Sequence, residues 1–130
     1  KGKRAVAISA GKVPVYGAGS KPTKMTDKAN ASSPCIRITA KATVGNVYLH
    51  SQDFWAEADC IILIPKDGLS LTYLYHWLKK NQSIIASLRK DSTMPGLDLD
   101  KFARLPFELP PMEYQKRVNK ILQDMELEIR

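Results

Sequence analysis

Hydrophobic positions along this chain predict strands in its first half and helices in its second half. Short apolar runs at 12–20, 35–39, 47–49 and 58–64 are bounded by Gly, Pro or polar residues, which predicts short strands. Gly45 and Asn46 mark a turn between two of these strands. Residues 21–34 are polar, contain two prolines and have no period, so they predict a long loop, and loops of this kind are often functional.

The first convincing helix is predicted from Ser70 or Leu71 to about Arg89. Its apolar residues recur at three- and four-residue steps, and Ser70 can cap its N-terminus. These apolar residues are Leu71, Leu74, Tyr75, Leu78, Ile84 or Ile85, and Leu88. Residues 99–102 predict one further helical turn.

A Pro-punctuated segment precedes the last helix. Residues 105–109 are expected to be extended, because a residue before Pro is biased away from helix. Pro110 and Pro111 then predict a rigid corner, and a helix begins at Pro111 or Met112 with Glu113 and Gln115 in its first turn. The narrow apolar stripe of this helix is typical of a coiled-coil seam, although a terminal helix packed on its own domain is the alternative. The stripe consists of Val118, Ile121, Leu122, Met125 and Ile129.

The length and composition of the chain predict one α+β domain. It has 130 residues, 44% of them hydrophobic, which is enough for a core. No apolar run approaches the roughly 20 residues that span a bilayer, and no signal segment is visible, so we expect a soluble cytoplasmic protein. The two cysteines, Cys35 and Cys60, lie in apolar runs without metal-binding spacing, which predicts buried free thiols.

Positive charge is concentrated in the first two-fifths of the chain. Residues 1–50 contain nine basic residues and one acidic residue, a net charge of +8. The remaining 80 residues contain 11 basic and 12 acidic residues, so the overall charge is +7. Such asymmetry indicates a polyanionic partner, because clustered Lys and Arg displace counterions from a phosphate backbone.

The sequence offers little catalytic chemistry. It contains no HExxH, no Cys/His cluster and no GxSxG, so we predict no metal site and no catalytic residues. The stretch "GAGS" at 17–20 lacks the context of a phosphate-binding loop, since Pro22 argues against a following helix. An enzyme acting alone is therefore a poor fit.

Binding chemistry is better represented. Lys side chains can neutralise phosphates, while hydroxyl, amide and imidazole groups can position the backbone or read base edges. Charge and loop placement give a candidate DNA-binding set: Ser20, Lys21, Thr23, Lys24, Lys28, Asn30, Lys41, Thr43, Asn46, His50, Ser51, Gln52, Arg89 and Lys90.

Three stretches, in order, resemble the target recognition domain of the DNA-specificity subunit of type I restriction-modification systems. They are "GKVPVYGAGS", "CIRITAKATVGNVYLHSQDFWAEADCIILIP" and a closing block that ends in "STMPGLDLDKFARLPFELPPMEYQKRV". The last is the most specific, although Tyr114 separates Glu113 from Gln115 where the family has adjacent Glu and Gln. The central block usually has two glycines, and here only Gly45 matches, with Ala42 at the other position.

The resemblance implies a domain at 1–110 that reads half of a split double-stranded DNA site without a cofactor. It implies a helix at 111–130 that packs against a second recognition domain or a second copy and docks on a methyltransferase subunit. That subunit would supply adenine methylation, and an endonuclease/translocase subunit would supply cleavage. Two alternatives stay open: the recognition segment of a single-chain DNA adenine methyltransferase or restriction-methylation enzyme, and a scaffold whose main role is helix-mediated assembly.

Overall fold

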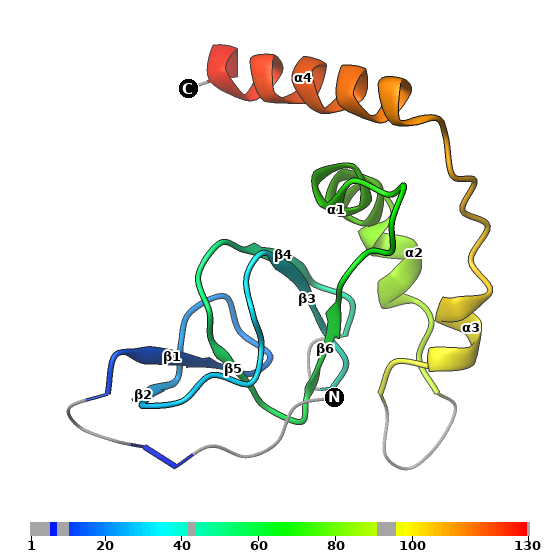
Figure 1. Cartoon of the computed structure of the whole chain (residues 1–130). Helices are drawn as coiled ribbons and strands as arrows, with labels where there is room; N and C mark the ends of the chain where they lie inside the picture. Colours follow the sequence, from blue (N-terminus) through cyan, green and yellow to red (C-terminus); the bar gives the residue numbers. More distant parts are fainter. Residues whose placement is uncertain (1–5, 8–10, 42–43, 91–95, 130) are drawn as a thin grey trace.

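The structure is a computed structural model that describes residues 6–7, 11–41, 44–90 and 96–129. Two small sheets lie side by side, and the helices lie beyond the second sheet (Figure 1). The first sheet has strand order β2-β1-β5 and the second β4-β3-β6. This mixed architecture agrees with the predicted combination of short strands and flanking helices.

The first sheet is built around β1 (Val13–Tyr16). It pairs antiparallel with β2 (Lys24–Thr26) and parallel with β5 (Trp55–Ala56). The prediction of an unstructured loop over 21–34 was wrong, because β2 lies inside it. The polar run at 23–26 is rich in strand-favouring Thr, and its pairing with β1 supplies the hydrogen bonds that its composition alone does not reveal.

The second sheet is antiparallel, with β3 (Cys35–Thr39) between β4 (Val47–His50) and β6 (Cys60–Leu63). All five β3 residues are buried. Ile36 and Ile38 pack into the core formed with the helices, whereas Cys35 belongs to a second cluster formed with Phe54, Ala56 and Cys60. The alternation of a strand therefore divides the interior in two. In β6, Cys60 is buried and the residues after it are only partly buried.

The turn at Gly45 is confirmed, and it requires glycine for two reasons. Gly45 has φ of +90°, which side-chain-bearing residues rarely adopt. A Cβ atom there would lie 2.6 Å from the backbone nitrogen of Ala86. The turn between β3 and β4 therefore packs directly against the helical layer.

The predicted helix from 70 to 89 is two helices, α1 (Leu71–Lys80) and α2 (Gln82–Ala86). Ser70 caps α1 as predicted, with its Oγ accepting from the Tyr73 N–H at 3.2 Å. Asn81 ends α1, and its side-chain amide donates to the Trp77 carbonyl at 2.8 Å, which also accepts from the Asn81 backbone N–H at 3.1 Å. The predicted helical turn at 99–102 is present as α3 (Leu99–Ala103), capped by Asp98.

Residues 105–109 form no helix or strand, with a bend at Leu105, and Phe107 packs edge-to-face on Trp77 of α1 with ring centroids 5.0 Å apart. The last helix, α4 (Met112–Ile129), begins where it was predicted and crosses α1, which is seen nearly end-on beneath it in Figure 1. Gln115 in its first turn is fully buried, whereas Glu113 is exposed.

The apolar stripe of α4 is only partly covered. Val118 and Leu122 are partly buried, while Ile121 and Met125 are 52% and 51% exposed. The side chain of Ile129 lies outside the described residues. Pairing of α4 with another helix stays a prediction. Within the described part of the chain, no helix is both long and apolar enough to span a bilayer.

Candidate nucleic-acid interface

Three of the predicted DNA-binding residues line one open pocket. Thr23 and Lys24 come from the β1–β2 hairpin, and Lys41 follows β3. The pocket has a volume of about 430 Å³, and its other lining residues are Gly17, Ala18, Glu57, Ala58 and Asp59. Segments that are far apart in the sequence thus place two ammonium groups, two carboxylates and a hydroxyl around one cavity.

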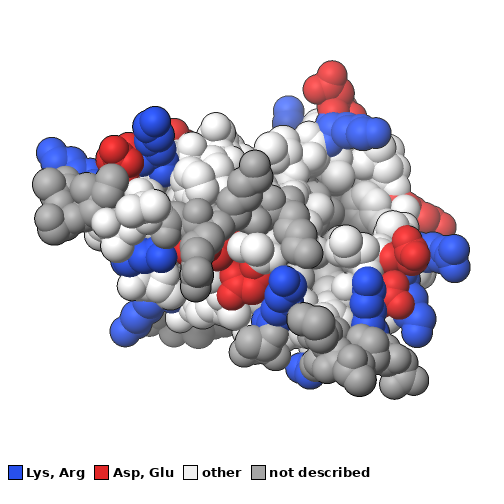
Figure 2. All heavy atoms as spheres, turned by 90° about the horizontal axis from the view of Figure 1, so that it is seen from below, with Lys and Arg blue, Asp and Glu red and all other residues white. Residues whose placement is uncertain are grey.

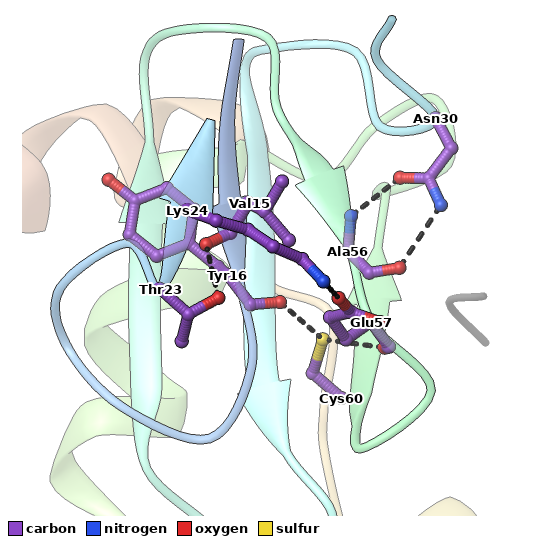
Figure 3. Close-up of polar contacts among 8 residues, drawn as sticks. All are labelled: Val15, Tyr16, Thr23, Lys24, Asn30, Ala56, Glu57 and Cys60. Carbon is purple, nitrogen blue, oxygen red and sulfur yellow. Dashed lines mark hydrogen bonds and ion pairs between the residues drawn. The ribbon is translucent and has the colours of Figure 1, made fainter. Parts of the chain in front are cut away.

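The hairpin that forms one wall is fixed at its base. Thr23 donates to the Val15 carbonyl from its backbone N–H at 2.8 Å and from its hydroxyl at 3.3 Å (Figure 3). Because its hydroxyl is used in this way, Thr23 serves the fold as well as the pocket. Ser20 and Lys21, at the hairpin tip, are exposed.

Lys24 does not stand alone in the pocket. Its Nζ lies 3.6 Å from a Glu57 carboxylate oxygen, and both side chains keep some exposure (Figure 3). Such a pair contributes little to stability, because solvent screens it. It does compensate one of the positive charges that the sequence places in this half of the chain.

Asn30 has a role inside the fold. Its side-chain amide accepts from the Ala56 N–H at 2.6 Å and donates to the Ala56 carbonyl at 3.0 Å (Figure 3). The amide thus acts as an additional strand partner for β5. The prediction that Asn30 reads a base edge is untested, but both ends of its amide are already bonded to the backbone.

His50 is also used within the domain. Its Nε2 accepts from the Nε of Arg37 at 2.9 Å, and its ring stacks on Phe54 with centroids 4.1 Å apart. Burial and the neighbouring Arg37 lower the pKa of His50 to about 4. The imidazole is therefore neutral at pH 7 and cannot act as a phosphate-binding cation.

Arg37 is a residue that the sequence analysis missed. It is fully buried on β3, and its Nη1 donates to the Gly17 carbonyl at 2.5 Å. The guanidinium lies 4.3 Å from the ring centroid of Tyr48 and 4.7 Å from that of Tyr16. Burial lowers the pKa of Arg37. A charged residue in the middle of an otherwise apolar predicted strand was the signal that could have found it.

The loop after β4 leaves Ser51 and Gln52 exposed. It is tied to the segment before β3 by Asp53, whose carboxylate accepts from the Ser33 N–H at 2.7 Å and from the Ser33 hydroxyl at 3.0 Å. These bonds to Ser33 lower the pKa of Asp53. Ser51 and Gln52 are thus presented on a fixed loop.

The remaining candidates are scattered. Arg89 and Lys90 are exposed, and the backbone bonds from Lys90 to Gly96 and from Leu97 to Ala40 bring them to the Lys41 end of β3. Lys28 is exposed near Asn30, whereas Asn46 is partly buried in the β3–β4 turn. Thr43 lies outside the described residues. On the face seen in Figure 2, basic side chains are spread out and interrupted by acidic ones, so they do not form one continuous patch there.

The thiols are buried and free, as predicted. Burial raises the pKa of Cys35, and it raises the pKa of Cys60 to about 11, because the charged thiolate is poorly solvated. Both are therefore protonated and unreactive at neutral pH. Among the described residues, no three His, Cys, Asp or Glu side chains are grouped to bind a metal ion.

Solved structures share this fold. The chain aligns over 97% of its length with 35% of the S subunit of a type I restriction-modification system from M. genitalium, with a TM-score of 0.80 and 23% identity. It aligns over 93% of its length with 32% of the HsdS subunit from Thermoanaerobacter tengcongensis, with a TM-score of 0.65 and 18% identity.

Sequence comparison leads to the same proteins. A 54-residue stretch, 42% of the chain, is 37% identical to the type I restriction enzyme MjaVIII specificity subunit of Methanocaldococcus jannaschii and spans 13% of that protein. The chain thus covers a minor part of each relative's length. Because the model of the type I restriction modification DNA specificity domain matches residues 3–130, the chain belongs to that family.

Proposed function

We propose that this chain binds double-stranded DNA and reads one half of a split target site, as the recognition domain of a type I specificity subunit. Family membership supports this role. The grouping of Thr23, Lys24 and Lys41 around one open pocket supports this pocket as the place where DNA binds. Residues 1–110 would form the reading unit. Residues 111–130 would begin the helix that contacts partners.

The mixed charge of the pocket fits base recognition better than phosphate binding alone. Lys41 and Lys24 can bond to the acceptor atoms of guanine in the major groove, and a carboxylate such as Asp59 can accept from the amino group of cytosine. The exposed Lys21, Lys28, Arg89 and Lys90 would contact phosphates, which position a protein on DNA without reading sequence.

The second exposed group, Ser51 and Gln52, would supply further base contacts. Gln can form two hydrogen bonds with adenine. His50 and Asn30 would act indirectly, by holding the loops that carry the reading residues, because their polar side-chain atoms are bonded to other residues of the domain.

The chemical steps would belong to partners. The methyltransferase subunit would methylate adenine in the site that the domain selects, and the endonuclease/translocase subunit would cleave DNA. Ile121 and Met125, half exposed on α4, would contact a second helix and help define the distance between two half-sites.

Methylome sequencing of cells with and without the intact gene tests the proposal. The expected result is a split motif with methylated adenine that disappears when the gene is deleted. Identical methylomes in a strain whose partner subunits are expressed would refute it. Methylation that persists on a motif after loss of the methyltransferase subunit alone would instead indicate a single-chain enzyme.

A further inference from the structure

The guanidinium of Arg37 touches two segments that lead to the two groups of exposed candidate residues. Nη1 donates to the carbonyl of Gly17, the first residue after β1, which begins the loop containing Ser20 and Lys21. Nε donates to Nε2 of His50, the last residue of β4, which precedes Ser51 and Gln52. One buried side chain therefore bridges the two sheets at the start of both loops.

The surroundings hold this guanidinium in one orientation. The rings of Tyr48 and Tyr16 lie within 4.3 and 4.7 Å of it, and Tyr16 also contacts His50 edge-to-face at 4.7 Å. His50 in turn stacks on Phe54, whose backbone pairs with Ala31. A planar group with donors in fixed directions, packed between aromatic faces, has little freedom to follow one loop without moving the other.

The interior location of Arg37 separates it from direct DNA contact. It is fully buried and does not line the pocket, whereas Gly17, whose carbonyl it bonds, does. An Arg whose only task is to fill the core would be replaceable by an apolar side chain, since buried charges are costly. Its hydrogen bonds instead join Gly17 and His50, the residues at which the two loops begin.

We propose that Arg37 is a positioning residue that sets the 17–22 loop relative to the 50–53 loop, so that both can read one DNA site together. This inference rests on the proposed function and adds to it a source of specificity that makes no contact with DNA. Loss of the bridge would leave phosphate contacts in place. The base-reading side chains on the two loops would no longer be held in the relative position that one DNA site requires.

The test uses the complete natural chain in complex with its methyltransferase partner. Affinities are measured for a duplex with the motif found by methylome sequencing and for a scrambled duplex of equal length. Arg37→Met keeps an unbranched side chain between the two rings, and His50→Phe keeps the stack on Phe54 while removing the acceptor. Tyr48→Phe, which keeps the ring under the guanidinium, is the control, and the melting temperature of each complex is recorded.

Both variants are expected to lower the preference for the motif about tenfold or more, with affinity for the scrambled duplex unchanged. The double variant should lose no more than the worse single one, because both changes break one bridge, whereas a direct DNA contact by His50 would make the losses multiply. If Arg37→Met does not fold, His50→Phe alone decides. A preference retained by the folded variants, or multiplying losses, would overturn the inference. A wild-type complex without any preference would overturn the proposed function, and this inference with it.

Discussion

The side chain of Gln115, on α4, accepts a 2.6 Å hydrogen bond from the backbone N–H of Ser70, the residue that caps α1. Its amide nitrogen donates to the carbonyls of Gly68 and Pro110 at 2.8 and 2.9 Å. One buried amide thus joins the turn before α1, the Pro110 corner and the last helix. This contact gives the corner a physical basis, since it fixes how α4 leaves the domain.

Gln115→Ala should lower the free energy of unfolding by about 2–4 kcal/mol, because three backbone groups lose their partner. Denaturant unfolding measures the change. Gln123→Ala, an exposed position on the same helix, is the matched control and should change stability by less than about 0.5 kcal/mol. Equal stabilities for the two variants would show that the corner does not depend on Gln115.

Three glycines separate the effects of backbone conformation and of crowding. Gly45→Ala should cost about 2–4 kcal/mol, because positive φ and a clash with the Ala86 backbone act together. Gly68 has φ of +87° with open space around it, so Gly68→Ala should cost only about 1 kcal/mol. Gly19→Ala, with neither constraint, should be nearly neutral. Thermal unfolding measures the three variants, and the melting temperature should fall most for Gly45→Ala, less for Gly68→Ala and least for Gly19→Ala. Any other order would contradict the described turn at Gly45.

The pH dependence of stability should reveal His50. Its folded pKa of about 4 lies below the unfolded value of 6.5, so the unfolded state binds more protons between these values. The stabilisation is complete above about pH 6.5 and is lost as the pH falls toward 4. Because the ring keeps some solvent contact, the loss is about 1–2 kcal/mol.

His50→Phe provides the comparison, since it cannot titrate. Urea unfolding at several pH values from 7 to 4.5 should give a steeper decline for the wild type than for this variant. Carboxylates such as Asp53 titrate in both proteins, so subtracting one stability-versus-pH curve from the other leaves the contribution of His50. Parallel curves would mean that His50 titrates normally and is not bonded to Arg37.

DNA contacts should divide into two kinds. Lys21→Ala should weaken binding to all sequences about equally and lower the salt slope by about 1, because it removes a phosphate contact. Gln52→Ala should relax recognition at one position, at a cost of roughly 1–3 kcal/mol. Lys101→Ala, on α3 on the helical side of the domain, should change neither quantity. Binding competition over a range of salt concentrations distinguishes these results, and a Gln52→Ala variant with unaltered specificity would remove that residue from the proposed base readers.

Much of the fold could be predicted because strong local signals agreed with the tertiary structure. The apolar run of β3, the Ser70 cap and the start of α4 after Pro111 each depend on residues within a few positions. The strand β2 was missed because it depends on a partner strand, and the break at Asn81 was missed because hydrophobic periodicity does not register a polar side chain that bonds to the backbone. β2 exists through pairing with β1, whereas the side chain of Asn81 bonds to the Trp77 carbonyl at the end of α1.

The candidate site could be predicted only as a set of residue types. Charge and loop placement found Thr23, Lys24 and Lys41, but only the folded chain brings them around one pocket. Asn30 and His50 have the chemistry of base readers, and the structure bonds their polar atoms within the domain. Arg37 could not be assigned a role from the sequence, because its partners lie 20 and 13 positions away.

Binding of the complete complex to its motif tests the central claim most directly. Equilibrium competition between the motif duplex and a scrambled duplex, at physiological salt, measures the specificity ratio. A domain that reads DNA sequence should give a ratio of about 10³ or more, and the ratio should fall when Lys41 or Gln52 is replaced by Ala. Equal affinity for the two duplexes in the wild-type complex would contradict the account.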